Sequence, residues 1–141
     1  MGALALAACA AVLCASAPAR AGDPFADMMA GKSATKGKKL QKAIEKADAH
    51  PLGSEQNPVR AAMPQGQRAY LALLRCSDGK APEFNRIGNM GIGVFGNIVD
   101  SYSVRCEGSE PAASTIYMDM YHAGYRETRS LPGFTLAAES E

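Results

Sequence analysis

The pentapeptide at residues 118–122 (MDMYH) holds the side chains best suited to metal chemistry. Two thioethers and one imidazole suit Cu(I), and Met118, Met120 and His122 share one face if the segment is a strand. The alternative is that both methionines fill the core and that His122 lies at the rim of the sheet. Strand geometry favours this alternative, because residues i and i+4 of a strand lie about 13 Å apart. We therefore predict no bound metal or cofactor, and these three residues are the candidate Cu(I) ligands if a site exists.

Acid–base chemistry could use Asp100, Asp119 or His122. Asp100 interrupts an apolar strand face, so it is either a buried general acid or base or a residue that a bulge turns to solvent. Asp119 and His122 would cooperate only on a helix, so a strand predicts that they lie apart. The chain has no G-x-S-x-G motif of a serine hydrolase. We predict no catalytic residue, and these three side chains remain the candidates.

Residues 91–98 (GIGVFGNI) match the G-x-G-x-x-G pattern of nucleotide-binding loops. That pattern must be followed by a helix, whereas residues 97–105 alternate as in a strand. A kinase loop would need a lysine on the next strand, and the chain has none after Lys80. The glycines therefore predict a wide loop that takes positive φ or approaches another segment closely. Such a loop beside a sheet edge is the best place to expect a ligand.

An uncharged, apolar run at residues 3–19 leads into Ala19-Arg20-Ala21, a small-x-small cleavage pattern. These features predict a signal peptide at residues 1–21 and a periplasmic or secreted bacterial protein. The run is shorter than the ~20 residues of a membrane-spanning helix, so we predict no transmembrane segment. Two alternatives stay open. Leu6-Ala7-Ala8-Cys9 matches a lipoprotein signal in which Cys9 is the lipid anchor, and the absence of a basic residue before the run allows a start codon further upstream.

Cleavage would leave two of the four cysteines, Cys76 and Cys106. In an oxidising compartment they most simply form one disulfide, and their spacing lacks the paired pattern of a zinc site. The chain carries 15 basic and 14 acidic residues, and it would lose Arg20 with the signal. This neutral balance excludes general nucleic-acid binding.

A lysine-rich segment precedes the core. Leu40, Ala43, Ile44 and Ala47 recur at helical spacing and predict a short amphipathic helix within residues 37–50. Its surroundings are basic, with Lys32, Lys36, Lys38, Lys39, Lys42 and Lys46. These lysines could bind an anionic envelope surface, such as lipid head groups or polyanionic polymers. The alternative is a solvated helix face without a partner.

Apolar alternation predicts strands at residues 69–76, 84–87, 97–105 and 115–122. The chain is therefore expected to adopt an α+β fold, a small antiparallel sheet with one N-terminal amphipathic helix and one disulfide. Residues 22–66 are expected to form a flexible lysine-rich arm, with the short helix and a loop rich in proline and glycine. Residues 67–141 are expected to form the disulfide-stabilised, β-rich core.

Five short runs carry a likeness to known proteins: HPLGS at 50–54, NPVR at 57–60, AYL at 69–71, LRC at 74–76 and MDMYH at 118–122. Over about residues 50–134 the chain resembles small exported bacterial proteins that form a domain family of unknown function. The resemblance implies export and a single domain, and it implies no activity.

We therefore predict a non-enzymatic recognition or binding domain of the cell envelope. A small hydrolase-like enzyme using Asp and His residues is the first alternative, and a periplasmic Cu(I)-binding module is the second. The substrate or partner and the oligomeric state stay open.

Overall fold

The computed structural model describes residues 23–138, which form an α+β fold with a mixed four-stranded sheet. The elements in chain order are α1 (Pro24–Met29), α2 (Gly37–Ala47), β1 (Val59–Arg60), α3 (Met63–Leu73), β2 (Leu74–Arg75), β3 (Glu83–Ile92), β4 (Ile98–Arg105), β5 (Ala113–Asp119) and β6 (Thr135–Leu136). The sheet order is β1-β5-β4-β3, and β2 pairs with β6 in a second small sheet. The predicted α+β class is confirmed. The sheet is not wholly antiparallel, because β1 runs parallel to β5.

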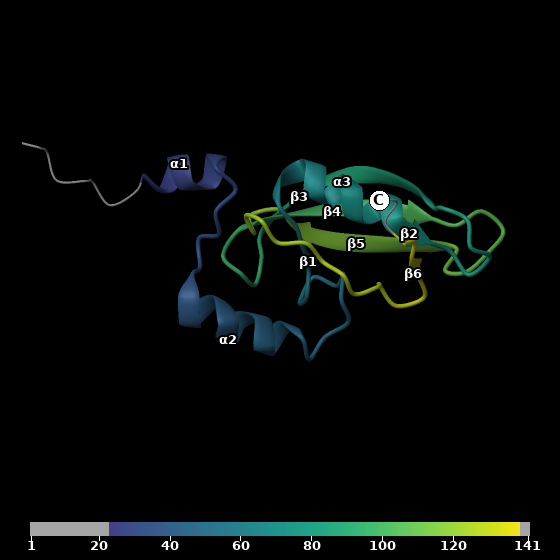
Figure 1. Ribbon diagram of the computed structural model, residues 1–141, viewed down its shortest axis with the longest axis horizontal. Helices are drawn as coiled ribbons and strands as arrows, with labels where there is room; N and C mark the ends of the chain where they lie inside the picture. The colour runs from purple at the N-terminus through teal and green to yellow at the C-terminus, as the bar shows by residue number, and fades with distance from the viewer. Residues whose placement is uncertain (1–22, 139–141) are drawn as a thin grey trace, which may run out of the picture.

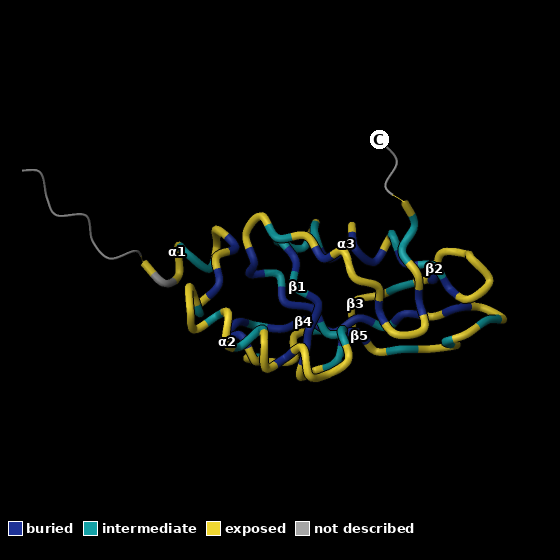
Figure 2. The backbone as a smooth tube through the Cα atoms, turned by 60° about the horizontal axis from the view of Figure 1, so that its bottom comes forward, coloured by how far each residue is buried: buried dark blue, intermediate teal, exposed yellow. Residues whose placement is uncertain are grey.

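The hydrophobic core lies between α3 and one face of the sheet (Figure 1). Strand alternation directs Tyr102 and Val104 of β4 and Met118 of β5 to this face, where Leu71 and Leu74 pack against them. Figure 2 shows the buried residues running along the central strands. Phe134, from the C-terminal segment, also belongs to the core cluster.

The predicted strand at residues 69–76 is wrong in most of its length. Residues 63–73 form α3, and only Leu74–Arg75 is extended. The run AYLALL is apolar on every position, so its periodicity does not separate a buried strand from a buried helix. Two local signals favour the helix: Pro64 lies in the first turn, and alanine and leucine are strong helix formers.

The predicted helix near residues 37–50 is confirmed as α2, and all its lysines are exposed. Leu40 and Ile44 are half-buried and Ala47 is buried, so the apolar stripe faces the rest of the protein. The chain after α2 enters the core earlier than the sequence suggested. Val59 is fully buried in β1 and belongs to the core cluster, because it pairs with Met118 at the edge of the sheet.

The predicted disulfide is confirmed. Cys76 follows β2 and Cys106 follows β4, their Cα atoms lie 5.9 Å apart, and the bond closes a separation of 30 residues. None of the helices within residues 23–138 has the length and apolar character needed to cross a membrane. The predicted signal peptide at residues 1–21, with Cys9, lies outside the described residues.

Candidate functional site

Asp119 and His122 lie side by side at the end of β5, against the expectation that a strand would separate them. The strand ends at Asp119, one carboxyl oxygen of which accepts a hydrogen bond of 2.9 Å from the backbone N–H of Tyr121. This bond to the residue two positions on is an Asx turn at the end of the strand. His122 Nε2 consequently lies 3.3 Å from Asp119 Oδ2, without the alignment of a hydrogen bond. The prediction of a strand through residue 122 is therefore wrong at its last residues.

Asn97 joins three segments behind this pair. Its Nδ2 donates to Asp119 Oδ2 at 2.9 Å and to Ser33 Oγ at 3.1 Å, and its Oδ1 accepts from the backbone N–H of Ala34 at 2.7 Å. Asn97 directly precedes β4, whereas Ser33 and Ala34 belong to the connection between α1 and α2. We call this cluster of three hydrogen bonds the Asn97 latch. It fixes the N-terminal connection onto the sheet.

The glycine-rich loop between β3 and β4 packs against His122 through Phe95. Phe95 is 1% exposed and meets the His122 ring edge-on, with ring centroids 5.2 Å apart. Gly96 has φ +80°, and a Cβ atom there would lie 3.1 Å from Thr35 Oγ1. The predicted positive φ and close approach are confirmed at Gly96, but the predicted wide loop is wrong. Strand β3 extends to Ile92, and the Gly93 N–H donates to the Asn97 carbonyl across a short turn. A side chain at Gly96 would be strained by the positive φ and would require the Thr35 side chain to shift by a few tenths of an ångström.

A cleft of about 390 Å³ opens between the connection from α1 to α2 and the β3–β4 hairpin. Tyr121 and Asn97 are buried residues that line it, and Met28, Ile92 and Ile98 give it apolar walls. Its charged residues are Asp27, Lys32 and Lys36. Asp27 binds Lys32 Nζ at 3.0 Å and Lys36 Nζ at 2.9 Å, one with each carboxyl oxygen. Hydrogen bonds from Lys36 and then Lys32 hold the pKa of Asp27 below its usual value.

Asp100 is buried, which is one of the two alternatives that the sequence left open, and it forms an ion pair with Arg86. Arg86 Nη2 of the neighbouring strand lies 2.7 Å from its Oδ1. This hydrogen bond and the charge of Asp100 raise the pKa of Arg86 further above its already high value. Asp100 pairs across the sheet with Met118, one position before Asp119, so Asp100 and Asp119 point to opposite faces. The structure does not bring these two candidates together.

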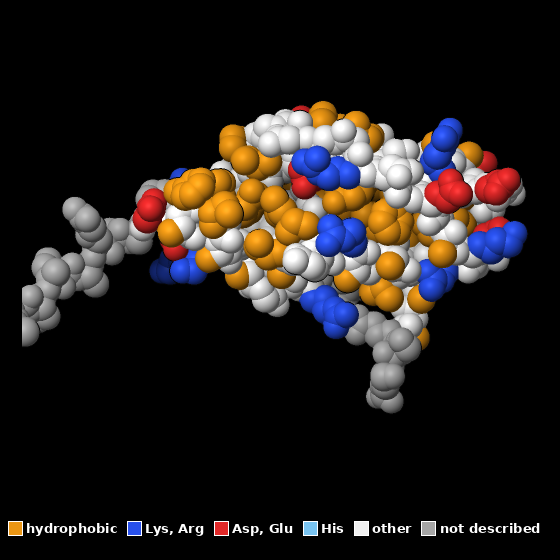
Figure 3. Space-filling model, turned by 90° about the horizontal axis from the view of Figure 1, so that it is seen from above, with side chains coloured by type: hydrophobic (Ala, Val, Ile, Leu, Met, Phe, Trp, Pro, Cys, Tyr) orange, Lys and Arg blue, Asp and Glu red, His pale blue; other side chains and the backbone are white. Residues whose placement is uncertain are grey.

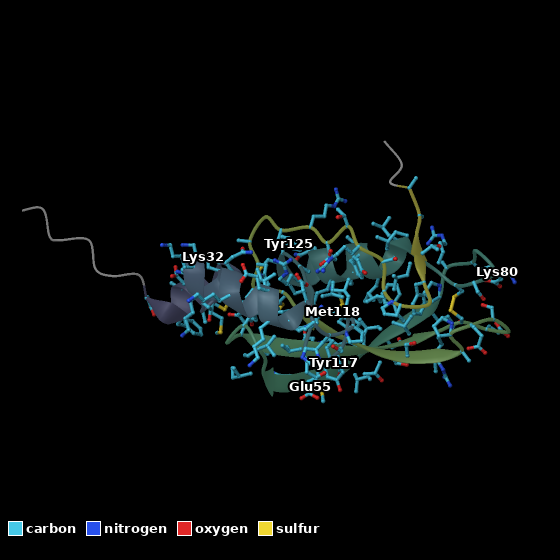
Figure 4. All side chains as sticks on the ribbon, turned by 90° about the horizontal axis from the view of Figure 1, so that it is seen from below. Lys32, Glu55, Lys80, Tyr117, Met118 and Tyr125 are labelled. Carbon is cyan, nitrogen blue, oxygen red and sulfur yellow. A yellow bond between two sulfur atoms is a disulfide. The ribbon has the colours of Figure 1, made fainter. Side chains whose placement is uncertain are left out.

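Met118 and His122 also have different surroundings. Met118 is fully buried in the core cluster with Leu71 and Leu74, and Figure 4 shows it between the helices and the sheet. His122 instead packs against Phe95 and Tyr125 beyond the end of β5. Met118 thus has the environment that core filling predicts. Within residues 23–138, no group of three or more His, Cys, Asp or Glu residues could hold a metal ion.

A second polar network, which the sequence did not indicate, secures the segment after His122. The buried Glu127 carboxylate accepts hydrogen bonds from Arg129 Nε and Nη2 at 3.0 Å each and from the Tyr125 hydroxyl at 3.2 Å. Arg60 donates to the same hydroxyl at 2.8 Å, and Arg129 also binds Asp48 just after α2. Its members come from three stretches of chain, at Asp48, at Arg60 and at residues 125–129, so no local pattern could have revealed the whole network.

The chemistry available at Asp119 is limited by these contacts. Its two oxygens are bound by the Tyr121 N–H and by Asn97 Nδ2, and the side chain is fully buried. In the described part of the chain, no serine, threonine or cysteine side chain hydrogen-bonds to His122. Asp119, His122 and Asn97 therefore form a buried cluster beside the cleft, in which the Asp119 oxygens are occupied by hydrogen bonds within the protein.

Comparison of the chain with protein-family models, with curated proteins and with solved structures gives no significant match.

Proposed function

We propose that the protein is an exported, non-enzymatic binding domain that attaches to the anionic lipid surface of the cell envelope through α1 and α2. One observation carries the proposal: α1 presents large apolar side chains to solvent, and α2, the next helix along the chain, carries a row of unpaired lysines. Phe25 is 64% exposed and Met29 is 63% exposed, and their i, i+4 spacing places them on one face of α1. Figure 3 shows hydrophobic side chains gathered over α1 at this end of the molecule.

The lysines of α2 supply the electrostatic part. Lys38, Lys39, Lys42 and Lys46 are exposed, and within residues 23–138 none of them forms an ion pair. Glu45 is the one acidic residue on the helix itself. A basic side chain near an anionic bilayer contributes about 1 kcal/mol to binding at physiological salt. Exposed phenylalanine and methionine favour a lipid surface over a polyanionic polymer, because only the lipid offers an apolar phase to enter.

Two features support the proposed location outside the cytoplasm. The disulfide between Cys76 and Cys106 suits an oxidising compartment. The predicted cleavage after Ala21 would place α1 at the new N-terminus, where its apolar face is free to meet a membrane.

Sedimentation with lipid vesicles tests the proposal. The protein from Gly22 onward should bind vesicles of 30% phosphatidylglycerol in phosphatidylcholine and release them at high salt. The variant Lys38→Gln/Lys39→Gln/Lys42→Gln/Lys46→Gln should lose about 100-fold or more in partitioning, from four contributions of about 1 kcal/mol. Phe25→Ser/Met29→Ser should lose about tenfold or more.

The matched controls are Lys80→Gln, at the far end near the disulfide (Figure 4), and Ile87→Ser, an equally exposed apolar residue on β3. Each should leave vesicle binding within about twofold. Equal binding to vesicles of pure phosphatidylcholine would overturn the proposal. So would binding to soluble polyphosphate with no binding to vesicles.

The contact between Asp119 and His122 supports one alternative, a small hydrolase that uses this pair for proton transfer. Turnover of chromogenic ester or phosphate substrates that disappears in both His122→Ala and Asp119→Asn, while the fold is kept, would favour it. Absence of turnover, or turnover that persists in both variants, would count against it.

A further inference from the structure

We propose that the cleft between the α1–α2 connection and the β3–β4 hairpin binds a small amphipathic monoanion, an acid group attached to an apolar body. This inference goes beyond attachment to a lipid surface, because it assigns a site for a single small molecule. The cleft lies where the glycine-rich loop meets the edge of the sheet, at the end of the molecule that carries both N-terminal helices (Figure 1).

The walls of the cleft suit an apolar body. Its lining includes Met28 of α1, Ile92 and Ile98 of the hairpin, and Tyr121 from the chain after β5. Ile92 is 71% exposed, so a ligand in the cleft would remove this side chain from water. The volume of about 390 Å³ lies within the range of about 300–1,000 Å³ that is common for small-ligand sites.

The charges of the cleft suit one acid group. Lys32 and Lys36 bring two positive charges, and Asp27, which binds both ammonium groups, removes one. One positive charge is left uncompensated among the residues that line the cleft. A monoanion neutralises it, whereas a neutral molecule leaves it unpaired and a dianion brings an excess of negative charge beside Asp27.

The cleft is preformed by the Asn97 latch. Both amide hydrogens of Asn97 and its oxygen are already bonded to Asp119, Ser33 and Ala34, so the amide holds the walls and leaves recognition of the acid group to the lysines. Gly96 allows the connection to approach the hairpin closely at Thr35. Walls fixed in this way lower the ordering cost of binding.

Two monoanions probe the site. The aromatic sulfonate 1-anilinonaphthalene-8-sulfonate reports binding by its fluorescence. The alkyl carboxylate decanoate should displace the sulfonate. Decanol, with the same chain and no charge, should displace it at least about tenfold less effectively. Lys32→Gln/Lys36→Gln changes the cleft from one positive to one negative charge and should weaken binding of both anions about tenfold or more. Ile92→Ser should weaken it about threefold or more.

The matched controls are Lys80→Gln near the disulfide and Ile87→Ser on β3, both exposed and outside the cleft. They should change the affinity by less than about twofold. Equal displacement by decanol and decanoate would overturn the proposal, as would an Ile87→Ser effect equal to that of Ile92→Ser. Failure of decanoate to displace the sulfonate would also overturn it, because the site would then not select an acid group on an apolar body.

This experiment can fail independently of the lipid-binding proposal. The α2 variant that lacks four lysines should lose vesicle binding and keep anion binding, whereas the Lys32→Gln/Lys36→Gln variant should lose anion binding even in the absence of lipid. Loss of both properties in both variants would mean that the two surfaces act as one, and the separate site in the cleft would be refuted.

Discussion

Replacing Asn97 with alanine should loosen the N-terminal connection and destabilise the whole fold. The substitution removes three hydrogen bonds, to Asp119, Ser33 and Ala34, and each contributes about 1 kcal/mol net. Asp119 is fully buried, and loss of its amide partner at Oδ2 adds a desolvation cost of about 1–2 kcal/mol. Water that enters the opened space would offset part of this. We therefore expect the free energy of unfolding to fall by about 3 kcal/mol.

Urea denaturation followed by circular dichroism measures that free energy, and hydrogen exchange of the peptide containing Ala34 measures the local effect. The Ala34 amide should exchange much faster in Asn97→Ala, because its acceptor is the Asn97 side chain. Asn85→Ala is the matched control: Asn85 is exposed on β3, and its replacement should change stability by less than about 0.5 kcal/mol. A loss of less than about 1 kcal/mol in Asn97→Ala, or unchanged exchange at Ala34, would refute the latch.

Two further predictions concern stability. Cys76→Ser/Cys106→Ser should lower the free energy of unfolding by about 3.5 kcal/mol, from the chain entropy of a 30-residue loop; an unchanged urea midpoint would contradict it. Burial tends to raise the pKa of Glu127, but hydrogen bonds from Arg129 and the charges of Arg129 and Arg60 outweigh it and hold that pKa below the usual 4.5. The stabilisation from Glu127 is therefore complete above about pH 4.5 and is lost as pH falls through the lowered folded-state pKa. Wild type should lose stability below that pH more steeply than Glu127→Gln, and parallel curves would contradict this.

The helix α3 shows where local periodicity stopped being informative. Residues 69–74 are apolar at every position, although Ala69 and Ala72 are exposed, so this stretch has no polar face to distinguish a period of 3.6 from a period of 2. By contrast, α2 carries one apolar stripe against exposed lysines, and its helical spacing was visible in the sequence. Such patterns identify an element only where polar residues mark its exposed face, as the lysines do on α2.

The candidate site shows a different limit. Asp119 and His122 were recognised as candidates, but their contact depends on the Asx turn that ends β5. Asn97, which hydrogen-bonds to Asp119, lies 22 residues before it in the chain. Ser33, which hydrogen-bonds to Asn97, lies a further 64 residues before Asn97. Neither residue has a neighbour in the chain that signals the pairing. A hydrogen bond across such distances is visible only when the fold is complete.

The sequence by itself determined the α+β class, the pairing of the two cysteines left after predicted cleavage, the amphipathic α2 and the strands β4 and β5. Each follows from composition or from a pattern along a short stretch, where neighbouring residues share one physical environment. The tertiary structure decided which face of β5 holds Met118 in the core, how Asp119 and His122 meet, and where the cleft forms between the glycine loop and the N-terminal connection. Those features arise from contacts between segments far apart in the chain, and the energies that fix them come from packing and buried hydrogen bonds that local sequence does not encode.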